Sequence, residues 1–93
     1  MVRDFRCKET EKIFNRQFSR KFPADIQRTA LRKLTLLDAA ESLDDLQIPP
    51  SNRLEKLAGD RKGQYSIRIN DQWRICFVWS RGDVRKVEIA DYH

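Results

Sequence analysis

The sequence is poor in the residues that usually hold metals. It contains one histidine, His93, and two cysteines, Cys7 and Cys76. A structural zinc site needs clusters of these residue types at short spacings, so the sequence predicts no metal site. The two cysteines could in principle pair, but a cytosolic compartment keeps thiols reduced, and we interpret both as small apolar residues.

Long hydrophobic runs and glycine-rich motifs are missing as well. The opening Met-Val-Arg-Asp-Phe has no apolar stretch of the signal-peptide kind, and no window approaches the length of a membrane helix. We therefore expect a cytoplasmic protein without membrane contact. No phosphate-binding glycine loop, nucleophile elbow or Cys-His pair at a recognisable spacing occurs, which excludes most enzyme classes and predicts no cofactor.

The composition is that of one small folded domain covering residues 1–93. Of its 93 residues, 40% are hydrophobic and 35% are charged, and the net charge is +5. A chain of this length can build a single modest core. A basic domain is electrostatically suited to phosphate-rich or acidic partners, although charge alone does not say which.

The first half of the chain predicts helices. Residues 2–7 alternate well enough for a short strand, and residues 8–22 predict a helix followed by a basic connection. Pro23 suits the first turn of the next helix, in which Ile26, Ala30, Leu34 and Leu37 share one face. Residues 38–41 extend it, residues 42–46 predict a further turn capped by serine, and Pro49-Pro50 should end all helix.

The second half predicts three strands joined by tight turns. Residues 64–69, 73–80 and 84–90 alternate between apolar and polar side chains, with turns at Asn70-Asp71 and at residues 81–83. Such strands form an antiparallel meander most simply, and its apolar face needs the helices as a cover. The sequence thus predicts an α+β fold with two helices packed on one face of the meander.

The opposite face of this sheet should be polar. Strand register places Arg68 and Arg74 on it, together with Lys86 and Tyr92 from the last strand. Arginine binds phosphate through a planar fork, which makes Arg74 the best candidate for an anion site. A solvated strand residue, or a partner for Glu88, explains Arg74 equally well. The charged segment 53–63 could clasp a nucleic-acid backbone or be an ordinary exposed loop.

Asp91-Tyr92-His93 follows the last predicted strand. Histidine titrates near neutral pH, tyrosine donates a hydrogen bond or a proton, and aspartate can orient either. Together with Glu55 and Arg74 these residues are compatible with metal-free cleavage of RNA by its own 2′-hydroxyl, which needs a base, an acid and a cation. The tripeptide alone is better explained as a frayed polar terminus, which is what most chain ends are. Alternation places Tyr92 on the Arg74 face and turns Asp91 and His93 away unless the chain bends after Ala90.

The chain resembles the HigB branch of RelE-type toxins. The resemblance rests on residues 57–77, which include Gly59-Asp60-Arg61 and Trp73-Arg74-Ile75, and on the closing Asp-Tyr-His. It implies a RelE-like domain that acts as the toxin of a type II toxin-antitoxin system and cuts mRNA in the ribosomal A site. It also implies neutralisation by a HigA-like antitoxin with a helix-turn-helix domain, so that operator DNA is contacted only indirectly, through the antitoxin.

The resemblance also assigns roles to residues. Arg74 matches the phosphate-contacting arginine of the family, and Asp91, Tyr92 and His93 match its catalytic terminus. We expect the RNA-binding residues to be Arg53, Lys56, Arg61, Lys62, Arg68 and Lys86.

Two positions depart from the family pattern, because Glu55 and Ala58 stand where better-known members have histidine and lysine. Glutamate, with an ordinary pKa of about 4.3, is a weak base that repels phosphate. Loss of an acid-base group can cost about a hundredfold in rate, so we expect a weaker toxin in which His93 carries the main proton transfer and Glu55 is at most an auxiliary base.

Two other functions remain open from the sequence. One is a non-enzymatic growth inhibitor on the same scaffold that binds a ribosomal assembly factor or DNA gyrase. The departures at Glu55 and Ala58 favour this function. The other is a stand-alone RNA-binding domain, which the lack of stacking aromatics on the predicted polar face disfavours.

Overall fold

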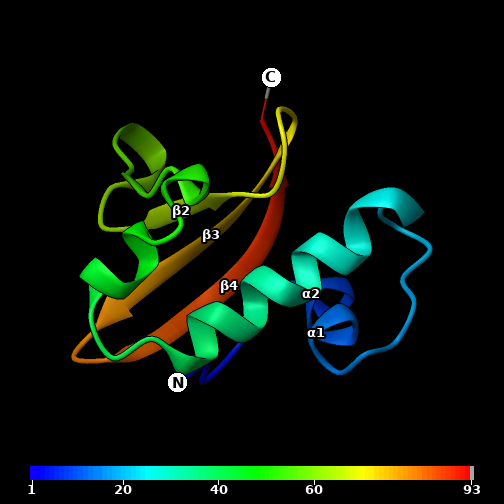
Figure 1. Ribbon diagram of the computed structural model, residues 1–93, viewed down its shortest axis with the longest axis horizontal. Coiled ribbons are helices and arrows are strands. Elements are labelled where there is room, and N and C mark those ends of the chain that lie inside the picture. Colours follow the sequence, from blue (N-terminus) through cyan, green and yellow to red (C-terminus); the bar gives the residue numbers. More distant parts are fainter. Residues whose placement is uncertain (93) are drawn as a thin grey trace.

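The computed structural model describes residues 1–92 and shows helices packed on one face of an antiparallel sheet (Figure 1). The sheet contains β1 (Glu55–Lys56), β2 (Tyr65–Arg68), β3 (Trp73–Ser80) and β4 (Asp83–Asp91). Neighbouring strands are antiparallel in the order β1-β2-β3-β4, which confirms the predicted α+β meander.

Strand β1 is an addition to the predicted sheet. The prediction of a loop over residues 53–63 is wrong for Glu55 and Lys56, which pair with Ser66 and Tyr65. Both β1 side chains are exposed, so two residues offered no alternation from which a strand could be predicted. This pairing brings Glu55 to the edge of the polar face.

Two α-helices precede the sheet within the described residues. Helix α1 covers Lys8–Phe14, and α2 covers Ala24–Ala39 with Pro23 as its N-terminal cap residue. Both helices were predicted, although α2 ends two residues earlier than expected. A 3-10 helix, Leu43–Gln47, supplies the predicted turn, and the Asp45 carboxylate accepts hydrogen bonds from the Glu41 and Ser42 backbone amides.

Short helical turns continue after the prolines, contrary to expectation. One 3-10 helix covers Pro50–Asn52 and another covers Gly59–Arg61. Each is only three residues long, too short to leave a periodic pattern in the sequence. None of the helices in residues 1–92 is long and apolar enough to span a membrane.

The core lies between α2 and the apolar face of the sheet. The stripe predicted on α2 is buried, and it belongs to one hydrophobic cluster with Ile67, Ile75 and Phe77 from β2 and β3. Strand β4 adds Val84, Val87 and Ile89 to the same cluster. Because the side chains of this cluster turn toward the helices, the other face of the sheet is left mainly for polar groups.

Residues 2–7 run beside β4 in parallel rather than forming a continuous strand. Isolated bridges join Val2 to Val84 and Phe5 to Val87, and the Arg3 and Arg6 amides donate to the Val84 and Val87 carbonyls at 2.8 and 2.9 Å. This segment covers the otherwise open edge of the sheet, where unpaired backbone groups would favour aggregation.

A β-bulge interrupts β4 between its pairing with Cys76 and with Val78. Lys86 lies in the bulge with φ +54°, and its backbone amide donates to the Asp4 carboxylate at 2.6 Å. The alternation that predicts Lys86 on the polar face also predicts Glu88 and Ala90 there. It is confirmed for Ala90 and Glu88, which lie opposite Arg74 and Cys76, and is wrong for Lys86. An extra residue breaks the alternation there, so Lys86 lies beside the N-terminal segment instead.

Candidate active site

Arg74 is the centre of the polar face. It comes from β3, is only 8% exposed, and donates from Nε to the Ser66 hydroxyl at 2.7 Å. Its Nη2 donates to the Arg53 carbonyl at 2.5 Å and to the Ser66 carbonyl at 3.4 Å. Charged donors gain most from such bonds, so the guanidinium is held in one orientation.

Glu55 lies next to this guanidinium. Its Oε2 is 3.9 Å from Nη2 of Arg74, and its side chain is 56% exposed. The two come together because Glu55 on β1 is paired with Ser66, the residue to which Arg74 bonds. The ion pair is long and faces water, so it holds Arg74 weakly compared with the hydrogen bonds. The alternative partnership of Arg74 with Glu88 does not occur.

Tyr92 lies on the same face, as its register predicted. Its hydroxyl is 3.9 Å from the Cys76 thiol, and its amide donates to the Gln72 carbonyl at 2.5 Å. Burial raises the pKa of Tyr92, and Cys76 raises it further, while Arg61 and Arg74 act in the opposite direction. The hydroxyl therefore keeps its proton at neutral pH and can donate it.

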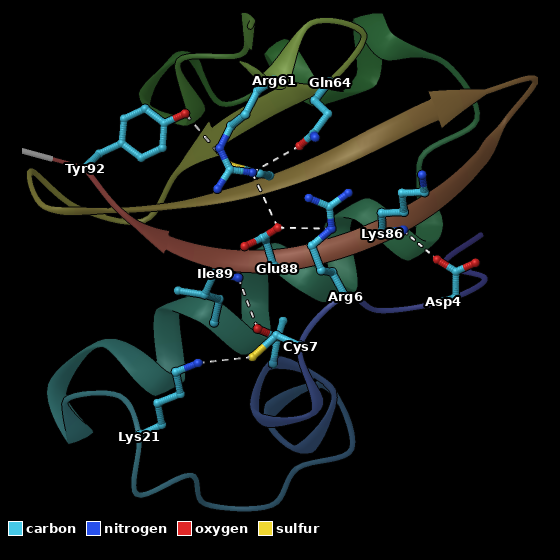
Figure 2. Close-up of polar contacts among 12 residues, drawn as sticks. Asp4, Arg6, Cys7, Lys21, Arg61, Gln64, Lys86, Glu88, Ile89 and Tyr92 are labelled. Carbon is cyan, nitrogen blue, oxygen red and sulfur yellow. Dashed lines mark hydrogen bonds and ion pairs between the residues drawn. The ribbon is translucent and has the colours of Figure 1, made fainter. Parts of the chain in front are cut away.

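A network of charged groups holds Arg61 beside Tyr92 (Figure 2). Nη1 of Arg61 is 3.4 Å from Oε2 of Glu88 and 3.3 Å from Oε1 of Gln64, and Nε of Arg6 is 3.5 Å from the same Glu88 oxygen. Burial opposes the charge of Arg61, but the hydrogen bond with Glu88 and the charges of Cys76, Glu88 and Tyr92 together outweigh it, so the pKa of Arg61 is raised. Arg61 thus remains a cation close to the Tyr92 hydroxyl.

The other predicted site residues are spread around this centre. Asp91 ends β4 opposite Trp73 and accepts a hydrogen bond from Gln72 at 3.1 Å. Arg68 forms an ion pair with Asp71, in the turn after β2. Arg53, Lys56 and Lys62 are exposed in the segment around β1. Figure 2 places Lys86 at the far end of β4 from Tyr92. His93 lies outside the described residues.

Several residues that shape the site were not predicted from the sequence. Alternation puts Ser66 on the same face as Arg68, so strand register could have paired it with Arg74. Gln64 and Cys76 could have been found in the same way. Arg6 could not, because only the parallel course of the N-terminal segment along β4 brings it to Glu88.

The arrangement combines the groups needed to cleave RNA at a phosphate. Arg74 and Arg61 supply positive charge, Tyr92 supplies a neutral proton donor, and Glu55 supplies a carboxylate able to accept a proton. Within residues 1–92, no group of three or more His, Cys, Asp or Glu side chains is placed to hold a metal ion.

Known proteins are similar to this chain in both sequence and fold. A family model described as the RelE-like toxin of the type II toxin-antitoxin system HigB matches residues 3–93. Toxin HigB-1 of Vibrio cholerae is 42% identical over 83 residues, covering 88% of this chain and 87% of the relative. Endoribonuclease HigB of Proteus vulgaris is 32% identical over 94 residues and both chains are covered completely.

Solved structures of similar fold include toxins bound to antitoxins. The heterotetrameric YoeB-YefM toxin-antitoxin complex of Staphylococcus aureus contains a chain that matches with a TM-score of 0.63 at 19% identity, covering all of this chain and 95% of the other. A second YoeB-YefM structure matches with a TM-score of 0.56 at 16% identity and the same coverage. At this identity the match concerns the fold alone. Together with the family match over nearly the whole chain, these findings show that the chain belongs to the HigB-like family of RelE-like toxins of type II toxin-antitoxin systems.

Proposed function

We propose that this toxin is an endoribonuclease that cuts mRNA on the ribosome without a metal ion and thereby stops translation and growth. The proposal draws on the relative named Endoribonuclease HigB and on the polar face just described. Its partners would then be the ribosome with its mRNA, in the cytoplasm, and a HigA-like helix-turn-helix antitoxin. The toxin would contact operator DNA only indirectly, through this antitoxin.

The orientation of Arg74 is the observation that carries the proposal. Hydrogen bonds from Nε and Nη2 fix the guanidinium, and Nη1 has no hydrogen-bond partner among the described residues. The side chain is 10% exposed, so part of it can be reached from solvent. A cation fixed in advance stabilises a crowded phosphate in the transition state without reorganising, which can be the largest single contribution to catalysis.

The remaining groups divide the proton transfers. The ribose 2′-hydroxyl loses a proton as it attacks the phosphorus, and the departing 5′-oxygen gains one. Tyr92 stays protonated at neutral pH and is suited to donate. In the proposal His93 shares this transfer, Asp91 orients the terminal groups, and Glu55 is an auxiliary base.

Substitution of Arg74 tests the proposal directly. We expect Arg74→Ala to lower the rate of mRNA cleavage by about a hundredfold or more and to relieve growth arrest. Arg74→Lys keeps the charge but not the planar fork, so it should recover only part of the rate. The rate is measured by mapping mRNA 5′ ends after induction, and with purified ribosomes. Full cleavage by Arg74→Ala would refute the site.

A non-enzymatic inhibitor of a ribosomal assembly factor or gyrase is the second candidate. The carboxylate of Glu55, 3.9 Å from Nη2 of Arg74, opposes the approach of a phosphate and favours this alternative. Intact mRNA with stalled ribosome assembly or damaged DNA after induction would support the inhibitor. Discrete cuts within translated codons would support the nuclease.

A further inference from the structure

A hollow lies on the helical side of the molecule, between α1, α2 and the connection that joins them. Its volume is about 230 Å³. The lining residues are Ile13, Arg16, Gln17, Phe18, Gln27, Arg28 and Leu31. Because α2 covers the apolar face of the sheet, this hollow is on the side away from Arg74. The connection is at the right of Figure 1, whereas β1 and β2 are at the left.

The hollow has an apolar part and a basic rim. Ile13, Phe18 and Leu31 supply the apolar surface, and Phe18 is 65% exposed. The side chains of Arg16 and Arg28 make no hydrogen bond or ion pair within residues 1–92, and no acidic residue lines the hollow. Unpaired arginines beside an exposed aromatic ring are typical of surfaces that bind protein partners.

The exposure of Phe18 is fixed by the fold. Gln27 on α2 donates from Nε2 to the Ser19 and Phe22 carbonyls at 2.6 and 2.9 Å, and its Oε1 accepts from the Ser19 amide at 3.0 Å. The Ser19 hydroxyl also donates to Glu9 at 2.7 Å, which ties the connection to α1. These bonds hold the chain on both sides of the hollow, so the site exists before a partner arrives.

We infer that this hollow is a docking site for a segment of the antitoxin in which one large apolar side chain is flanked by carboxylates. A dry cavity of about 150 Å³ already accepts benzene, so the hollow has room for one branched or aromatic side chain. The unpaired rim arginines match carboxylates on both sides of that anchor. An RNA backbone would match the rim but would leave the apolar part without a partner.

The inference deepens one part of the proposed function, the antitoxin partner, and does not depend on RNA cleavage. It implies that the antitoxin can bind without covering Arg74. Neutralisation would then come from the bulk of the bound antitoxin, which keeps the toxin out of the ribosome.

Variants of the hollow separate neutralisation from toxicity. The probe is a purified HigA-like antitoxin that neutralises this toxin, and its affinity is measured by calorimetry. We expect Phe18→Asp and Arg28→Glu each to weaken antitoxin binding by about thirtyfold or more, as for central residues of an interface. Both variants should still arrest growth, and co-expressed antitoxin should no longer rescue the cells.

The matched control is Arg81→Glu, the same change of charge on the β3–β4 turn. Gly82 of that turn lies near the Glu41 carbonyl, beyond the opposite end of α2 from Arg28. This variant should bind the antitoxin normally, and thermal unfolding verifies that all three variants are folded.

Three results would overturn the inference. They are unchanged antitoxin affinity in both variants of the hollow, an equal loss in Arg81→Glu, and a loss of binding to ribosomal subunits without any loss of antitoxin binding. The last result would assign the hollow to RNA. The nuclease proposal fails by a different observation, namely intact mRNA after induction of the wild-type toxin. That result would not change the antitoxin affinities measured by calorimetry.

Discussion

The Tyr92 hydroxyl lies among groups that act on its proton in opposite directions. Burial and the neighbouring Cys76 thiol raise the pKa of Tyr92, whereas the Arg61 and Arg74 cations lower it, and the net pKa is raised. The thiol is itself kept neutral, since burial raises the pKa of Cys76. A hydroxyl that stays protonated beside two cations is better placed to give a proton to a leaving oxygen than to take one from the 2′-hydroxyl.

Tyr92→Phe removes this donor while keeping the ring. We expect the cleavage rate at saturating ribosome concentration to fall by about a hundredfold, because a positioned acid contributes roughly that much. The free energy of unfolding should change by less than about 1 kcal/mol, since the side-chain partner of this hydroxyl within residues 1–92 is the Cys76 thiol, a weak donor 3.9 Å away. Single-turnover kinetics and chemical denaturation measure the two quantities. An unchanged rate would exclude Tyr92 as the proton donor.

At the scale of elements, a buried polar contact couples α2 to the segment before β1. Lys33 on α2 is 6% exposed and donates from Nζ to the Asn52 side chain, which is fully buried. The Asn52 amide in turn donates to the Leu46 and Ile48 carbonyls at 3.2 and 3.3 Å. The next residue, Arg53, offers the carbonyl that holds Arg74. A helix on one side of the sheet therefore supports the candidate site on the other.

Lys33→Met tests this coupling. The change leaves the buried Asn52 oxygen without its donor, which should lower the free energy of unfolding by about 1–3 kcal/mol. The Arg53 carbonyl loses support at the same time, so the cleavage rate should fall without a change in ribosome affinity. Lys8→Met, an exposed position on α1, is the control and should change neither quantity. A Lys33→Met protein with the stability and the cleavage rate of the wild type would show that this contact does not support the candidate site.

The stability difference should also depend on pH. Burial lowers the pKa of Lys33 below its ordinary 10.5, and Arg32 and Arg68 lower it further. Between the lowered pKa and 10.5 the unfolded chain binds more protons than the folded protein, so the contribution of Lys33 to stability increases as the pH rises. The difference in the free energy of unfolding between wild type and Lys33→Met should therefore increase toward pH 10.

The predicted elements show which physical signals a sequence carries. The stripe on α2 and the alternation of β2, β3 and β4 come from burial on one face, which repeats along many residues and can be recognised. Strand β1 has two exposed residues and the bulge at Lys86 depends on one positive φ, so neither repeats. For the same reason Ser66 could be placed next to Arg74 by register, but the Arg53 carbonyl could not, because it follows from a left-handed turn at that residue.

For the whole molecule, the distribution of charge matters more than the net +5. Four acids lie between residues 38 and 45, Asp38, Glu41, Asp44 and Asp45. The basic side chains gather instead around β1 on the polar face and around the hollow between the helices. Each basic region can serve a different acidic partner, so that under the two proposals above RNA and the antitoxin would bind on separate surfaces.

Salt dependence of RNA binding tests this separation. Four exposed or half-exposed cations surround the candidate site, namely Arg53, Lys56, Arg61 and Lys62. If all four contact phosphates of single-stranded RNA, a plot of log affinity against log salt concentration should have a slope of about −3. The affinity should then fall about fiftyfold between 50 and 200 mM salt. The double change Arg53→Gln with Lys56→Gln should reduce the slope by about 1.4, whereas Arg16→Gln with Arg28→Gln at the hollow should leave it unchanged. Equal slopes for the two double variants in a filter-binding titration would mean that RNA does not distinguish the two faces.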